Sequence, residues 1–132
     1  MTRISDIIFC MNAVSTQDRG MCANGILTSI TPASIPGQFS FSVVVTFLGL
    51  DTSKPHRIKV EMFNEKEVTA SVEGAMPLTR DNTGLPADYR GLNLKMDWNR
   101  INFRSEGEYT LTVAVDGQLL GEKKFYVMAK KK

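Results

Sequence analysis

The sequence predicts an all-β chain that folds as an antiparallel two-sheet β-sandwich of about eight strands. Three observations predict this class. Apolar and polar residues alternate along several short segments, which is the period of a half-buried strand. Glycine, proline, asparagine or aspartate separate these segments at short intervals. No stretch has convincing helical periodicity. A chain of 132 residues is expected to form one domain, here residues 1–128, followed by a basic C-terminal tail at 129–132.

The last quarter of the chain contains the clearest hairpin. Its first strand places apolar residues at every second position: Tyr109, Leu111, Val113 and Val115. Asp116-Gly117 follows directly, and this pair favours a type I′ turn that matches the twist of the flanking strands. Leu120 and Phe125 on the return strand differ in parity, so one residue has to be absorbed between them. We predict a β-bulge at Gly121.

Tyr109 begins a strand directly after a turn at Gly107. In immunoglobulin-like sandwiches, a tyrosine at this place donates a hydrogen bond to the upstream backbone, an arrangement called the tyrosine corner. The alternative is an ordinary core aromatic residue, and the sequence leaves both interpretations open.

The other strands follow from the same alternation. They are expected at residues 4–14, 26–30, 38–48, 57–63, 68–72 and 92–98, with a turn at Asn99-Arg100 before Ile101 and Phe103. Residues 15–25 are polar and contain two glycines, so they are expected to form a loop. Residues 74–91 form the longest irregular stretch, and loops of this length in compact domains are often functional.

Charge and composition exclude several classes of protein. Lys130, Lys131 and Lys132 contribute three of the 16 basic residues, so the rest of the chain carries 13 basic against 14 acidic residues. General nucleic-acid binding needs a concentrated basic face, which is not expected here. No apolar window approaches a membrane span, and the N-terminus lacks the features of a signal peptide. We therefore expect a cytoplasmic protein without a membrane partner.

The two cysteines, Cys10 and Cys22, lack metal-ligand neighbours at useful spacing. For an intracellular chain, a buried thiol at Cys10 and an incidental one at Cys22 is the favoured interpretation. A disulfide between them is the alternative.

Several motifs together resemble small bacterial proteins of uncharacterised families. The residues that carry the resemblance are Leu85-Pro86-Ala87-Asp88-Tyr89-Arg90-Gly91, the Leu-rich strand at 92–98, Gly107-Glu108-Tyr109, Asp116-Gly117, Pro36-Gly37 with Phe39 and Phe41, and Leu48-Gly49-Leu50-Asp51. The resemblance covers most of the chain. It implies an immunoglobulin-like sandwich and no activity, because these families have no assigned function.

The residues that carry catalytic chemistry are sparse. His56 is the only histidine, and it is interpreted as an exposed turn residue at the start of a strand. Asp81, Asn82 and Asp88 do not have the spacing of a calcium loop, so no metal is expected. Phosphate-binding glycine motifs and the G-x-S-x-G motif are absent. We predict no enzymatic activity and no cofactor.

Four residues are candidates for recognition, because tyrosine, tryptophan and arginine are favoured interface anchors: Tyr89, Arg90, Trp98 and Arg100. The structural alternative places Trp98 in the core and makes Arg90 an anchor for its own loop, and the alternation of Trp98 with Leu94 and Met96 favours it.

The leading hypothesis is a non-enzymatic binding or scaffold domain that acts through loops or sheet edges. Its partner would be an unidentified protein or, through edge strands, a second copy. The loop at 74–91 is the expected contact surface. The alternative is a protein that sequesters a small anionic ligand, such as a nucleotide, with the loop arginines Arg80, Arg90 and Arg100. An enzyme with an unfamiliar site and a structural module of a phage particle stay open.

Overall fold

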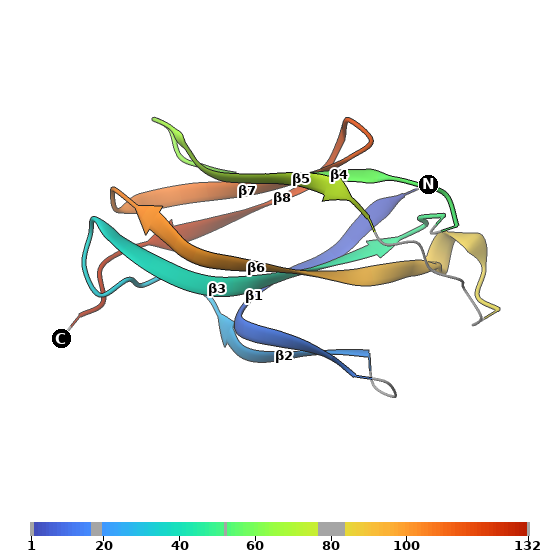
Figure 1. The fold of residues 1–132 in the computed structure, drawn as a ribbon, viewed down its shortest axis with the longest axis horizontal. Coiled ribbons are helices and arrows are strands. Elements are labelled where there is room, and N and C mark those ends of the chain that lie inside the picture. Colours follow the sequence, from blue (N-terminus) through green and yellow to red (C-terminus); the bar gives the residue numbers. More distant parts are fainter. Residues whose placement is uncertain (1, 17–19, 52, 77–83, 132) are drawn as a thin grey trace.

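The computed structural model describes residues 2–16, 20–51, 53–76 and 84–131, and it shows a sandwich of two four-stranded antiparallel sheets (Figure 1). The strands are β1 (Arg3–Thr16), β2 (Gly20–Leu27), β3 (Gly37–Leu48), β4 (Arg57–Phe63), β5 (Val68–Ala75), β6 (Gly91–Phe103), β7 (Gly107–Val115) and β8 (Gln118–Val127). The first sheet has the order β2-β1-β3-β6, and the second has the order β5-β4-β7-β8. The helical content of the described residues is a single 3-10 turn, Ala87–Tyr89. None of the described helices is long and apolar enough to cross a membrane.

The arrangement is immunoglobulin-like. The chain passes from one sheet to the other three times: between β3 and β4, between β5 and β6, and between β6 and β7. At the third crossing, the hydroxyl of Tyr109 donates a hydrogen bond of 2.9 Å to the backbone oxygen of Ser105. Tyr109 is also fully buried, so it forms the tyrosine corner as well as contributing to the core. The all-β class, the two sheets and the eight strands are confirmed.

The core lies between the sheets and is rich in aromatic contacts. The ring of Phe125 on β8 lies 4.9 Å from the ring of Phe9 on β1 and 5.8 Å from that of Tyr109. Such edge-to-face and offset pairs add to the apolar area that they bury. Phe41, Val43 and Phe47 of β3 belong to the same core as the inward-facing residues of the terminal hairpin.

The terminal hairpin has the predicted turn. Asp116 and Gly117 have φ angles of 52° and 82°, as a type I′ turn requires. The bulge predicted from the change of parity between Leu120 and Phe125 is also present. Val113 pairs with Gly121 and Ala114 pairs with Leu119, so Leu120 is the inserted residue, directly before the predicted Gly121.

The prediction of a loop at residues 15–25 is wrong for most of that stretch. Strand β1 continues to Thr16, and β2 pairs with it from Gly20 to Leu27 in an antiparallel arm. The predicted strand at 26–30 shortens accordingly, and Ile30 keeps only a parallel bridge to Val127. The arm folds because its small residues pack: Ala13 and Ala23 join Val44 and Cys10 in a second apolar cluster on the outer face of the first sheet. Tertiary packing therefore overrides the low strand propensity of this glycine-containing stretch.

The turn predicted at Asn99-Arg100 is also wrong, because β6 runs through it without interruption. Phe41 pairs with Trp98 and Phe39 pairs with Ile101, so two residues of β6 lie opposite one residue of β3. This is a β-bulge, and Arg100 takes a left-handed φ of 53° within it. Asn99-Arg100 does break the regular strand geometry, as the sequence indicates. It does so as a bulge, and the strand continues beyond it.

Both cysteine thiols are free, with Cys10 buried and Cys22 exposed, in agreement with the favoured interpretation. The first residues of the predicted tail contact the domain. The backbone amide of Lys130 donates to the oxygen of Pro32 at 2.8 Å, and that of Ala129 donates to Glu106 Oε2 at 3.4 Å.

Candidate functional site: the open side between β5 and β6

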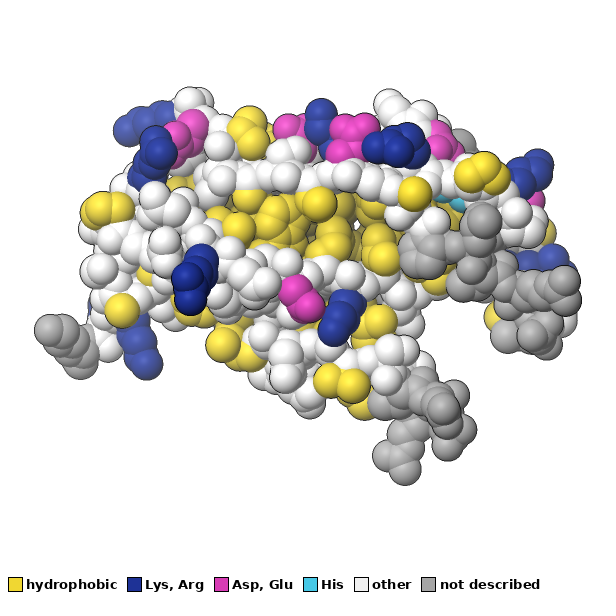
Figure 2. All heavy atoms as spheres, in the orientation of Figure 1, with side chains coloured by type: hydrophobic (Ala, Val, Ile, Leu, Met, Phe, Trp, Pro, Cys, Tyr) yellow, Lys and Arg dark blue, Asp and Glu magenta, His cyan; other side chains and the backbone are white. Residues whose placement is uncertain are grey.

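The sandwich has an open side where the edge strands of the two sheets, β5 and β6, face each other. Figure 2 shows hydrophobic side chains in the hollow between the two sheets on this side. A groove of about 500 Å³ lies there, lined by Ala70, Ser71, Val72, Met96, Asp97, Trp98, Asn99 and Ile101. We call this groove, with the two strands that border it, the open side.

The inner face of β5 is only partly covered. Val72 pairs with Val60, and directly opposite residues of paired strands share a face. Val60 is fully buried on an internal strand, yet Val72 is 44% exposed on the edge strand of the same sheet. Val68 differs. A bulge between Met62 and Phe63 places it opposite Phe63, on the outer face.

Trp98 contributes the largest side chain to the floor of the groove. Only 6% of it is exposed, which confirms that it is a core residue. Its indole nitrogen Nε1 is buried and has no hydrogen-bond partner among the described residues. Leaving a buried donor unpaired costs about 1–3 kcal/mol, so this is an unfavourable feature for a side chain with a purely structural role.

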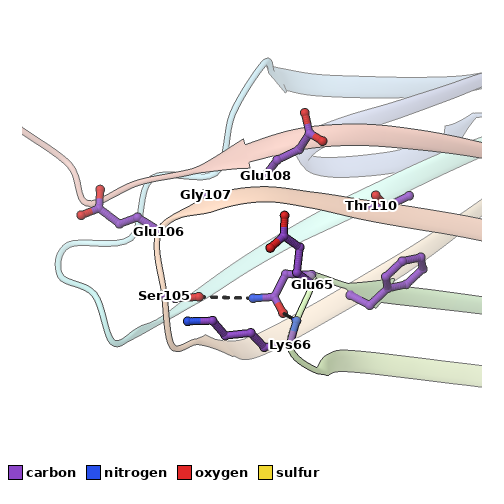
Figure 3. Close-up of a pocket in the computed structure, with 9 residues that line it drawn as sticks. Glu65, Lys66, Ser105, Glu106, Gly107, Glu108 and Thr110 are labelled. Carbon is purple, nitrogen blue, oxygen red and sulfur yellow. Dashed lines mark hydrogen bonds between the residues drawn. The ribbon is translucent and has the colours of Figure 1, made fainter.

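A second hollow, of about 430 Å³, lies at one end of the sandwich, where the β4–β5 turn meets the β6–β7 corner (Figure 3). Asn64 joins the two: its Nδ2 donates to Ser105 Oγ at 3.2 Å, and its Oδ1 accepts from the backbone amide of Lys66 at 2.9 Å. The carboxylates of Glu65, Glu106 and Glu108 point in different directions in Figure 3. No group of three potential metal ligands occurs in the described parts of the chain. We interpret this hollow as a structural corner.

The structure places Tyr89 and Arg90 at the entry to β6. The Arg90 side chain donates from Nε to the backbone oxygen of Leu85 at 2.6 Å, so it anchors its own loop, as the structural alternative states. Tyr89 lies on the 3-10 turn and is exposed. The guanidinium of Arg3 lies 5.2 Å from its ring centre and donates to the backbone oxygen of Asp88 at 2.7 Å. This contact fastens the end of the long loop to β1.

The candidate arginines do not come together. Arg90 precedes the first residue of β6 and Arg100 lies in its bulge, ten residues further on. An extended strand rises about 3.3 Å per residue, so about 30 Å separates the two backbones. Arg80 and residues 77–83 of the long loop lie outside the described residues, as do Asp81 and Asn82. The geometry of Arg90 and Arg100 therefore does not form a site for a single small anion.

His56 is not the exposed turn residue that the sequence suggested. Its side chain is 17% exposed and bridges two loops. Nδ1 lies 2.6 Å from Asp116 Oδ2, and Nε2 lies 2.8 Å from the backbone oxygen of Asp51. The hydrogen bond to Asp116 is the main cause of a raised pKa at His56, and it lowers the pKa of Asp116. The sequence could not reveal the partners, since Asp116 is 60 residues away.

Sequence reasoning missed the lining of the open side apart from Trp98. The sequence pattern places Ala70, Val72 and Met96 in strands and gives no signal that they line a groove. One available signal was the composition of β5, which has no lysine, arginine or proline along its length. Natural edge strands usually carry such residues as protection against pairing with other chains.

Comparison with known proteins identifies a family. Residues 5–128 match the family of unknown function DUF6941, so the chain belongs to that family. No curated protein matches the sequence. The chain is similar to part of the Pseudomonas fluorescens alkylpurine DNA glycosylase AlkC bound to DNA with an abasic site analog. The identity is 8% over 97% of this chain and 30% of that one, with a TM-score of 0.54. It also resembles an immunoglobulin-like protein from Pseudomonas aeruginosa, with 19% identity over 97% of both chains and a TM-score of 0.47. The chain thus spans less than a third of the glycosylase, and that likeness shows the fold alone.

Proposed function

We propose that this member of DUF6941 is a non-enzymatic protein-binding domain whose contact surface is the open side between β5 and β6. The observation that carries the proposal is the groove itself, in which an inward-facing valine, Val72, is 44% exposed above the nearly buried Trp98. Binding sites are typically concave and mostly apolar, with a few polar groups that orient the ligand. The polar residues Ser71, Asp97 and Asn99 also line the groove and supply such groups.

A catalytic role has less support than binding. The only histidine, His56, is held between Asp116 and Asp51 in a contact that joins two loops. The arginines Arg90 and Arg100 are too far apart to hold one anion, so sequestration of a nucleotide is not proposed. A cytoplasmic location belongs to the proposal, and the free thiols of Cys10 and Cys22 support it.

The experiment selects binders from a phage-displayed library of random twelve-residue peptides against the whole chain. Enriched peptides are then synthesised, and their binding is measured by the fluorescence of Trp98, the only tryptophan. We expect Val72→Glu to weaken binding at least tenfold, because it places a carboxylate on the apolar groove. Val72 is already half exposed, so the variant is expected to fold.

The matched control is Val68→Glu, the same substitution on the same strand but on the outer face, where Val68 is 57% exposed. We expect it to bind like the unmodified chain. The proposal is wrong if no peptide is enriched, or if the enriched peptides bind the Val72→Glu chain as tightly as the unmodified one.

A further inference from the structure

We infer that the partner binds as an added strand along β5, so that its recognised part is an extended segment with apolar residues at alternate positions and a basic residue between them. This inference rests on the proposed function and specifies how the open side is used. Strand addition to an exposed sheet edge is a recurring mode of peptide recognition, in which backbone hydrogen bonds supply affinity and side-chain pockets supply specificity.

The other edges carry features that oppose pairing. On β8, Lys123 points between the sheets, with Nζ donating to the backbone oxygen of Ile7 at 2.8 Å and lying 4.9 Å from the Phe9 ring centre. An inward charge and the bulge at Leu120 both protect an edge. Strand β6 carries a β-bulge at Arg100, and β2 contains two glycines with positive φ. Strand β5 is regular from Ala70 to Gly74.

The backbone of β5 presents hydrogen-bonding groups to the free edge. The amide of Met76 donates to the oxygen of His56 at 2.9 Å, which sets the phase of the β4–β5 ladder. In an antiparallel pair, hydrogen-bonded and non-hydrogen-bonded positions alternate. The register therefore points the backbone N–H and C=O groups of Val72 and Gly74 toward β4. The backbone groups of Ser71 and Glu73 point toward the free edge.

The same register sets the side-chain pattern of the ligand. A residue that pairs with Ser71 or Glu73 projects toward the outer face, and its neighbours project over the groove beside Val72 and Trp98. The groove therefore selects apolar side chains at every second position.

Charge complementarity identifies the class of partner. Glu73 is the only charged residue of β5, and it is exposed on the outer face beside Arg57, at 3.6 Å. A lysine or arginine directly opposite Glu73 forms a favourable cross-strand pair. A second copy of β5 has no basic residue to supply this pair. We therefore assign the site to a segment of a different protein.

The test uses the peptides selected from the library and two variants of Ser71. Ser71→Pro removes an outward amide donor and leaves the β4–β5 ladder intact, because proline is tolerated where the amide faces away from the sheet. Ser71→Ala keeps the donor and removes only the hydroxyl. We expect Ser71→Pro to weaken binding at least tenfold and Ser71→Ala to leave it unchanged, and the enriched peptides to show the alternating pattern with a basic residue.

A scan of the selected peptides by N-methylation of single backbone amides tests the same inference without changing the protein. Strand addition predicts that methylation weakens binding at every second residue and has little effect between. If affinity depends on Val72 but neither on Ser71→Pro nor on the phase of the methylation scan, strand addition is wrong and the groove proposal stands. If Val72→Glu has no effect on binding, the proposed function itself is wrong.

Discussion

At the scale of the residue, His56 joins two distant loops through both ring nitrogens. One nitrogen faces a carboxylate of Asp116 and the other a backbone oxygen of Asp51, and both of these groups accept hydrogen bonds. Asp116 Oδ1 also accepts from the backbone amide of Arg57 at 2.9 Å, which fixes the carboxylate. The doubly protonated imidazolium satisfies both contacts, and the pKa of His56 is raised mainly by the hydrogen bond to Asp116.

This geometry predicts a stability that depends on pH. Because the folded pKa of His56 is raised, its stabilising contribution is complete below the unfolded value of about 6.5 and is lost as pH rises through the folded value. We expect the thermal midpoint of the unmodified chain to fall between pH 6 and pH 8. His56→Ala should flatten the profile in that window, since the chain has no other histidine. Equal slopes for both chains would show that the bridge does not titrate.

At the scale of the element, a close approach of backbones holds the start of β6. Gly91 pairs with Leu48, and a β-carbon added at Gly91 would overlap the carbonyl oxygen of Phe47. The chain therefore needs glycine at this place for steric reasons. This contact aligns β6 with β3, and through that pairing it positions Trp98 and the floor of the groove.

A pair of glycine substitutions checks this constraint. Gly91→Ala should lower the free energy of unfolding by about 2 kcal/mol or more, in the range of overpacked sites. The control is Gly74→Ala on β5, where an added β-carbon meets nothing within 4 Å. It should be neutral or slightly stabilising. Chemical denaturation of both variants measures the difference, and similar unfolding midpoints would contradict a close approach at Gly91.

The sequence predicted elements well where local signals and tertiary packing agree. In the terminal hairpin, alternation predicted the strands, the Asp-Gly pair predicted a type I′ turn, and the change of parity predicted a bulge. All three predictions were confirmed. In the β1–β2 arm, the local signals favoured a loop, and the small residues Ala13 and Ala23 form strands because they pack against Val44. Such packing brings together residues that are far apart in sequence, so no local window contains the signal.

At the scale of the whole molecule, the open side arises because β5 and β6 are the edge strands of their sheets. Alternation predicts that Val72 and Trp98 face inward, but it does not predict that β5 is an edge strand on which Val72 stays 44% exposed. Residue type alone also failed to locate the groove. Of the residues predicted for recognition, Tyr89 and Arg90 hold a loop, and Arg100 occupies a bulge. Self-association through edge strands stays a prediction that light scattering can test.

The most direct test of the central claim is an NMR titration of the ¹⁵N-labelled chain with a selected peptide. The chain contains one tryptophan, so the indole N–H of Trp98 gives a single, assigned resonance. Binding at the open side predicts the largest shifts at this resonance and at the amides of Ser71 and Glu73, with few changes at Tyr89 and Arg90. Shifts confined to Tyr89 and Arg90, with the indole resonance unmoved, would contradict the account.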